Sequence, residues 1–102
     1  MIHHIDDTTA DGQELSSCQA TYGVSNLSKP GRVTLPSGDC PIGSLLVVSN
    51  VQGEMCSITV LPAQNESLDF NGLKINEIEI QPGIIATFCR RYQRWQATIS
   101  SR

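Results

Sequence analysis

The chain has 102 residues, of which 39% are hydrophobic and 17% are charged, and its net charge is −3. This length suits a single domain with one hydrophobic core. The low charge content excludes a charge-driven disordered chain, and the negative net charge argues against a general nucleic-acid binder. No apolar run approaches the roughly 20 residues that span a membrane, and the acidic, polar start lacks the apolar region of a signal peptide. We therefore expect a soluble, unexported protein that contacts neither membrane nor nucleic acid.

β-branched residues dominate the composition. Ile, Val and Thr together number 23, whereas Ala, Glu, Lys and Met together number 14. Gly and Pro recur at intervals that leave segments of roughly 5–10 residues, which is the length of strands and too short for most helices. The sequence therefore predicts an all-β fold, a small antiparallel β-sandwich or jelly-roll-like barrel of short strands joined by tight turns.

The N-terminal segment differs in charge from the rest of the chain. Residues 1–28 contain four acidic residues and no Lys or Arg, whereas residues 29–102 have a net charge of +1. Few large apolar residues occur before position 29, so we predict an extended N-terminal arm over residues 1–28 and a β-sandwich domain over residues 29–102. A frayed tail is the alternative. The adjacent His3 and His4 diverge on an extended chain, so we expect no metal site there.

Three strands are expected in the first half of the β-domain. Residues 32–35 alternate, with Val33 and Leu35 on one face. Residues 44–49 are apolar on both faces, which predicts a strand covered on both sides, followed by a turn over residues 50–53. Residues 56–61 alternate again, with Cys56, Ile58 and Val60 on one face, and Pro62 ends the strand.

The second half contains sharper turn signals. Asn71-Gly72 is the pair favoured in a type I′ hairpin turn, and residues 81–84 form a Pro-Gly turn. Between these two turns the apolar residues shift from odd to even positions in the sequence. This shift predicts a β-bulge near Asn76-Glu77. Residues 84–90 and 95–101 make a final pair of strands around the loop 91–94. The predicted core consists of Val33, Leu35, Leu45, Val47, Ile58, Val60, Ile75, Ile78, Ile80, Phe88, Trp95, Ala97 and Ile99.

The four cysteines do not form a metal-binding motif. Cys18, Cys40, Cys56 and Cys89 are widely spaced, without a Cys-x-x-Cys pair. Structural zinc is therefore not expected. We expect buried, reduced thiols, with two disulfides as the alternative outside a reducing cytosol.

A basic cluster lies near the C-terminus. Arg90, Arg91 and Arg94 lie beside Tyr92 and Trp95. We interpret this cluster as a patch that binds an acidic partner, such as the acidic arm of a neighbouring copy. The alternative is that it is only the solvated end of a hairpin. The arm would bind through the apolar anchors Tyr22, Val24 and Leu27. The predicted interface residues are therefore Tyr22, Val24, Leu27, Arg90, Arg91 and Arg94.

Motifs of enzymes are missing from the sequence. It contains no Gly-x-Gly-x-x-Gly, phosphate-binding loop, Gly-x-Ser-x-Gly elbow or His-Glu-x-x-His. Each of these motifs supplies a defined cofactor contact, nucleophile or metal site. We therefore expect a protein that is not an enzyme, with no catalytic residues, cofactor or metal.

A series of turns and strands runs from Leu35 to Ala97. Its motifs are Leu35-Pro36-Ser37-Gly38, Ile42-Gly43, Leu45-Leu46-Val47-Val48, Ile58-Thr59-Val60-Leu61-Pro62, Phe70-Asn71-Gly72, Gln81-Pro82-Gly83, Ala86-Thr87-Phe88 and Trp95-Gln96-Ala97. In this order they resemble a β module that recurs in structural proteins of tailed-bacteriophage virions. The segment before Arg32 and the four cysteines depart from that pattern.

The resemblance implies a non-enzymatic virion protein. Proteins of this kind occur in tail fibres, head fibres and capsid decoration (cement) proteins, commonly as homotrimers. For this short chain it implies a decoration protein that is made in the host cytoplasm and lies on the outer capsid surface. Its partners would be the major capsid protein and further copies of itself. The alternatives are a short head-fibre or tail-fibre knob and a host-surface binding module.

Overall fold

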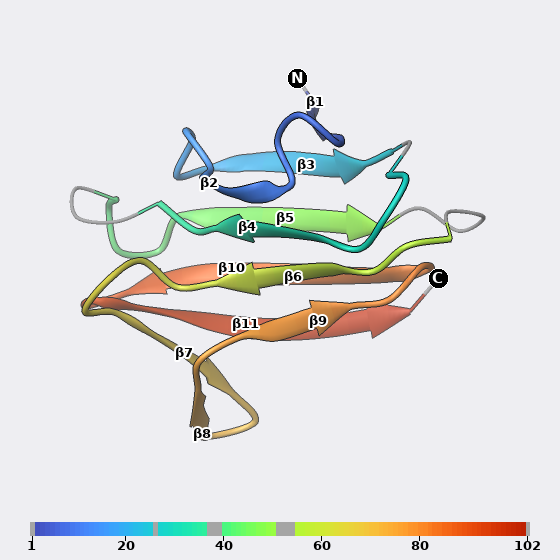
Figure 1. Cartoon of the computed structure of the whole chain (residues 1–102). Helices are drawn as coiled ribbons and strands as arrows, with labels where there is room; N and C mark the ends of the chain where they lie inside the picture. The colour runs from blue at the N-terminus through green and yellow to red at the C-terminus, as the bar shows by residue number, and fades with distance from the viewer. Residues whose placement is uncertain (1, 26, 37–39, 51–54, 102) are drawn as a thin grey trace.

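The computed structural model describes residues 2–25, 27–36, 40–50 and 55–101, and these contain strands but no helix. The strands are β1 (Ile2–Ile5), β2 (Asp11–Glu14), β3 (Ala20–Val24), β4 (Gly31–Thr34), β5 (Leu45–Asn50), β6 (Ile58–Leu61), β7 (Ser67–Phe70), β8 (Leu73–Ile75), β9 (Ile78–Ile80), β10 (Ile84–Arg91) and β11 (Arg94–Ser101). They form a seven-stranded sheet in the order β1-β3-β5-β10-β11-β7-β8 and a four-stranded sheet in the order β2-β4-β6-β9. In Figure 1 the smaller sheet lies in front of the larger one. The predicted all-β fold is confirmed.

The chain alternates between the two sheets from β1 to β6. The odd strands β1, β3 and β5 pair parallel in the larger sheet, and the even strands β2, β4 and β6 pair parallel in the smaller one. Each circuit therefore adds one strand to each layer, as in a short parallel β-solenoid. Two parallel strands need a long connection between them, and in this protein that connection contains a strand of the opposite sheet.

The larger sheet also contains antiparallel pairs. The hairpin β10–β11 inserts between β5 and β7, and β10 pairs antiparallel with both β5 and β11. The sequence predicted an antiparallel sandwich, and the structure combines antiparallel with parallel pairs, since β7 also pairs parallel with β11. Apolar alternation is the same in both kinds of half-buried strand, so the sequence pattern does not distinguish them.

The core lies between the two inner faces. Trp95 and Phe88 of the larger sheet are fully buried, as are Ile58 and Val60 of the smaller one. The indole N–H of Trp95 donates to the carbonyl oxygen of Pro36 at 3.1 Å, which links the layers. The predicted core residues that are buried are Val33, Leu35, Ile58, Val60, Ile78, Ile80, Phe88, Trp95 and Ala97.

The prediction for β5 placed the wrong residues in the core. Leu46 and Val48 are fully buried, whereas Leu45 is 49% exposed and Val47 is half-buried. Because residues 45–48 are all apolar, the sequence has no alternation that shows which two of them face the core. The strand is also not covered on both sides. The other predicted core positions that are only partly buried, Ile75 and Ile99, lie near strand ends.

The N-terminal segment is part of the fold rather than an extended arm. Within residues 1–28, β1 and β3 belong to the larger sheet and β2 belongs to the smaller one. Ile5 and Val24 are fully buried and Tyr22 is 3% exposed. The prediction failed because this segment has few apolar residues, but β3 needs only alternate positions to cover its share of the core.

The predicted turns are confirmed where the structure describes them. Asn71 and Gly72 both have positive φ, of 54° and 79°, as a type I′ turn requires. The amide N–H of Ile84 donates to the Gln81 carbonyl across the Pro-Gly turn, at 3.1 Å. The predicted turn over residues 50–53 lies largely outside the described residues, as does most of the turn after Leu35.

The predicted β-bulge near Asn76-Glu77 is wrong. Ile75 ends β8 in the larger sheet, and Ile78 begins β9 in the smaller one. The parity changes because the chain crosses between layers, and each strand must then direct its apolar residues toward the same core from the opposite side.

The cysteines also differ from the expectation of reduced thiols. Cys18 and Cys40 form a disulfide with a Cα–Cα distance of 5.4 Å. It ties the chain just before β3 to the chain before β5. Cys56 and Cys89 are free and partly buried.

Replacing the buried indole tests this packing. Trp95→Ala should lower the free energy of unfolding by about 3–5 kcal/mol, because it leaves a cavity between the sheets. Tyr92→Ala, at a ring that is 74% exposed, should change it by less than about 1 kcal/mol. Denaturant unfolding measures both values. Equal effects of the two substitutions would contradict the buried position of Trp95.

Candidate functional site

The candidate site lies at the end of the β10–β11 hairpin, where two other segments of the chain lie beside the turn. Arg91 and Arg94 are paired, so Tyr92 and Gln93 alone form the turn, and Gln93 has φ of 54°. The loop before β5 lies beside it, because the Gly43 amide donates to the Arg90 carbonyl at 2.9 Å. On the other side β7 begins at Ser67, which is paired with Arg94.

A buried ion pair forms the floor of this region. The Arg90 guanidinium donates twice to the Glu66 carboxylate, at 2.7 Å and 3.0 Å. The two side chains are only 3% and 8% exposed. The guanidinium carbon also lies 5.3 Å from the centre of the Trp95 ring, within the range of a cation–π contact. Two parallel hydrogen bonds and an aromatic face fix the position of Arg90.

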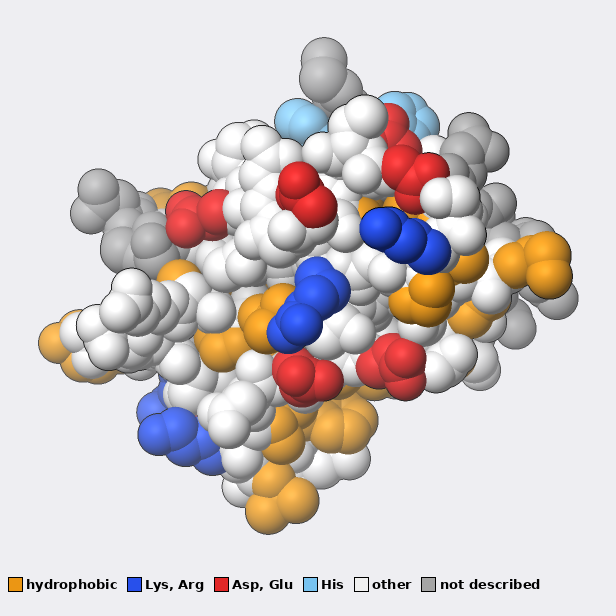
Figure 2. All heavy atoms as spheres, viewed as in Figure 1, with side chains coloured by type: hydrophobic (Ala, Val, Ile, Leu, Met, Phe, Trp, Pro, Cys, Tyr) orange, Lys and Arg blue, Asp and Glu red, His pale blue; other side chains and the backbone are white. Residues whose placement is uncertain are grey.

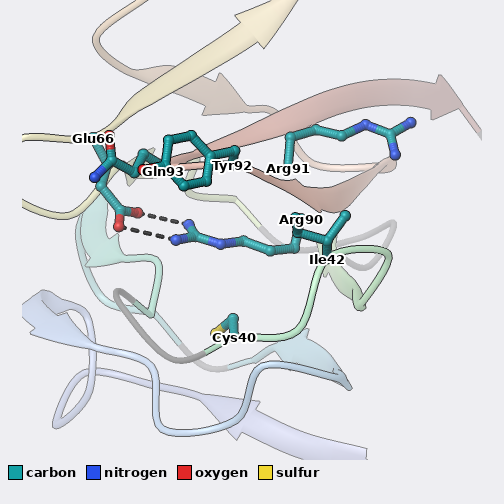
Figure 3. Close-up of a pocket in the computed structure, with 7 residues that line it drawn as sticks. All are labelled: Cys40, Ile42, Glu66, Arg90, Arg91, Tyr92 and Gln93. Carbon is teal, nitrogen blue, oxygen red and sulfur yellow. Dashed lines mark hydrogen bonds and ion pairs between the residues drawn. The ribbon is translucent and has the colours of Figure 1, made fainter.

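Two open hollows lie on either side of the hairpin turn. The first, of about 300 Å³, is lined by Cys40, Ile42, Glu66, Arg90, Arg91, Tyr92 and Gln93. The second, of about 500 Å³, is lined by Asn65, Glu66, Ser67, Lys74, Asn76, Tyr92, Gln93 and Arg94. Figure 3 shows Tyr92 and Gln93 beside the Arg90–Glu66 pair, Cys40 and Ile42 around the rest of the first hollow, and Arg91 extending away from the pair. The turn is thus a ridge between two hollows.

The predicted arginine patch is divided by the structure. Arg90 is buried against Glu66, so it is not available to a partner. Arg94 is exposed and forms an ion pair with Asp69 at 2.8 Å. Arg91 is exposed, and its guanidinium donates to the side-chain oxygen of Gln96. Of the three, Arg91 alone has no ion pair within the described part of the chain.

The predicted anchors do not form an interface. Tyr22 and Val24 are buried in the protein's own core, and Leu27 is packed against it. The Tyr22 hydroxyl accepts a hydrogen bond from the Ser17 amide at 3.1 Å. The correction follows from the position of β3 inside the larger sheet, where its inward side chains are already covered.

Sequence reasoning missed Glu66 and Ile42 as members of this region, and it noted Tyr92 only as a neighbour of the arginines. Ile42 is 67% exposed and Tyr92 is 74% exposed. An aromatic residue in a two-residue hairpin turn points beyond the sheet, so the turn position was a usable signal for Tyr92. Nothing local identifies Glu66, because 24 residues separate it from Arg90.

The outer faces of the two sheets differ in charge. On the smaller sheet the paired row Asp11, Arg32, Thr59 and Glu79 carries charges of both signs. Figure 2 shows acidic and basic side chains gathered on this side of the molecule. On β3, β5, β10 and β11 the outward positions between the two ends are uncharged; they are Thr21, Gly23, Leu45, Val47, Ser49, Ile85, Thr87, Cys89, Gln96, Thr98 and Ser100. We call these residues the neutral face.

The buried ion pair gives a direct stability test. Glu66→Gln should lower the free energy of unfolding by about 3–5 kcal/mol, because it leaves the Arg90 charge buried without a counterion. Asp69→Asn makes the same chemical change in the exposed pair with Arg94 and should cost less than about 1 kcal/mol. Denaturant unfolding of both variants measures the difference. Equal losses would show that the Arg90–Glu66 pair is solvated.

Comparisons with protein-family models, with curated proteins and with solved structures find no match for the chain. Among the described residues there is no group of three or more His, Cys, Asp or Glu side chains that could hold a metal ion. The same residues include no helix long and apolar enough to cross a membrane. The resemblance to virion β modules remains an expectation from the order of motifs in the sequence.

Proposed function

We propose that the chain is a non-enzymatic structural protein of a tailed-bacteriophage virion, namely a capsid decoration protein that binds the outer surface of the head shell as an oligomer. Two arguments support this proposal. The order of turns and strands between Leu35 and Ala97 resembles virion β modules. The neutral face of the larger sheet, which is the observation that carries the proposal, offers a surface for association.

The neutral face combines apolar and small polar side chains. Leu45 is 49% exposed, and Val47, Ile85, Thr87 and Cys89 are partly exposed. A central row crosses four strands, because Thr21 pairs with Val47, Val47 with Thr87, and Thr87 with Thr98. Contiguous surfaces of this kind are typical of protein–protein contacts.

A second copy of the chain is the partner that suits this face best. In a symmetric contact, residues on the symmetry axis meet their own copies, so a charge at the centre of the contact faces a like charge, which costs free energy. The neutral face avoids this problem, whereas the smaller sheet presents Arg32 and Glu79. The homotrimer that the virion resemblance implies would use the neutral face, and the remaining surface would contact the major capsid protein.

A host-surface binding module is the second candidate function. The observation that favours it is the ridge of Tyr92 and Gln93 between two hollows, which association through the neutral face leaves at one end of the sheet. A head-fibre or tail-fibre knob would combine both properties, with self-association through the sheet and binding at the hairpin end.

Introducing one charge at the centre of the neutral face tests the proposal. The wild-type protein should have about three times the 11.1 kDa mass of the chain in multi-angle light scattering. Thr87→Lys should shift it to the monomer, because the face would place like charges together. Thr59→Lys makes the same change at the centre of the smaller sheet and should leave the oligomer intact.

Co-sedimentation with heads of the phage that encodes the chain tests the virion assignment. The wild-type protein should sediment with heads, and Thr87→Lys should sediment less if the shell binds the oligomer. A monomeric wild-type protein would refute self-association. An oligomer that never sediments with heads would refute the decoration function and leave the fibre or host-binding alternatives.

A further inference from the structure

We infer that the two hollows on either side of Tyr92 form one binding groove for an acidic oligosaccharide. This inference does not depend on the capsid decoration function, and it names a ligand for the site that favours the second candidate function. The first observation is the exposed ring. Tyr92 is 74% exposed and lines both hollows. The core is closed beneath it by Trp95 and Arg90, so the Tyr92 ring makes no contribution to the core that would explain an aromatic residue here.

A ring between two hollows suits a ligand that is longer than one ring. The apolar face of a sugar ring can lie on an aromatic side chain, and the neighbouring sugar rings then extend to either side. A tyrosine provides such a face together with a polar hydroxyl group. A compact ligand would need one enclosed pocket, whereas both hollows here are open and share the residues Tyr92, Gln93 and Glu66.

The second hollow has the hydrogen-bonding groups that a sugar requires. Its lining includes the amide side chains of Asn65, Asn76 and Gln93 and the hydroxyl group of Ser67. Amides and hydroxyls both donate and accept hydrogen bonds, as do sugar hydroxyl groups. The first hollow adds the exposed apolar side chain of Ile42.

The charge of the groove favours a carboxylated sugar. Arg90 is neutralised by Glu66 and Arg94 by Asp69. In the described part of the chain Lys74 has no ion pair, so the second hollow retains one uncompensated positive charge. Arg91 lines the first hollow and also has no ion pair in the described part of the chain, so the groove has two separate cations. Such spacing suits occasional carboxylates along a saccharide. Nucleic acid binding would require several phosphate contacts along an extended basic surface.

The walls of the groove are already rigid. The Arg90–Glu66 pair is buried, Cys40 is held by its disulfide to Cys18, and the turn of Tyr92 and Gln93 is the shortest common hairpin connection. A preformed site loses less conformational entropy when a ligand binds. Ordering of loops is therefore not a barrier to binding here.

Titration followed by amide chemical shifts tests the inference. The probes are tetragalacturonate, a hyaluronan tetrasaccharide and a dimer of N-acetylneuraminic acid, with maltotetraose as the neutral comparison. At least one acidic probe should shift the amides of Asn65, Lys74, Tyr92 and Gln93, and it should bind more tightly than maltotetraose.

Variants then assign the contacts. Tyr92→Ala should weaken the best probe by about tenfold or more, whereas Tyr92→Phe, which keeps the ring, should stay within about threefold. Lys74→Gln should weaken acidic probes and leave maltotetraose unchanged. Lys29→Gln, at an exposed lysine that does not line the groove, and Leu73→Ala, at a side chain that is 68% exposed, are the controls and should bind as wild type.

Several results would overturn the inference. No shift with any of the three acidic probes, or shifts away from the hairpin end, would refute the groove. Unchanged binding by Tyr92→Ala would refute the stacking contact. Equal affinity for maltotetraose would refute the preference for acidic sugars, and tighter binding of a single-stranded oligonucleotide would assign the site to nucleic acid instead.

Discussion

The structure depends on one constraint: from β1 to β6 the chain must change sheet at every strand. A strand that buries one face needs a partner layer, and here the next strand of the chain provides that layer. Each circuit therefore buries apolar residues from both sheets in the same core, and its backbone groups pair with the circuits above and below. Gly31 shows how closely the chain is packed, because a Cβ atom added there would clash with the Cβ of Ala10. This arrangement explains why a segment with few apolar residues is ordered.

The hairpin β10–β11 joins β5 to β7 in the larger sheet and positions the candidate site. It pairs with β5 on one side and with β7 on the other, so its turn lies where several chain segments meet. Burial of Arg90 in that position would be costly without a counterion, and Glu66 supplies one from the loop before β7. The inward residues of the hairpin are thus fixed by the core and the ion pair. The turn residues Tyr92 and Gln93 are left outside, where they are free to serve binding.

The molecule has two surfaces that could act at the same time. The neutral face lies on the outer side of the larger sheet, and the groove lies at the end of the hairpin that runs through this sheet. Residues such as Thr87 and Val47 belong to the first surface, and Tyr92 and Lys74 belong to the second. Association through the sheet would place one groove on each copy, and weak binding by each copy would then add up across the oligomer. This arrangement is compatible with a virion protein that contacts both its own shell and a second surface.

Local features of the sequence determined the all-β class, the turns at Asn71-Gly72 and Pro82-Gly83, and the inward position of Trp95. These properties depend on the conformational preferences of single residues and on alternation within one strand, both of which can be read from short segments. Tertiary structure alone decided which strands became neighbours, since parallel and antiparallel strands have the same pattern. It also decided which of Leu45 and Leu46 is buried, because the two leucines are chemically equivalent until a second sheet covers one of them. The partner of Arg90 likewise comes from a distant loop, because a buried charge is satisfied by whatever carboxylate the fold brings within hydrogen-bonding distance.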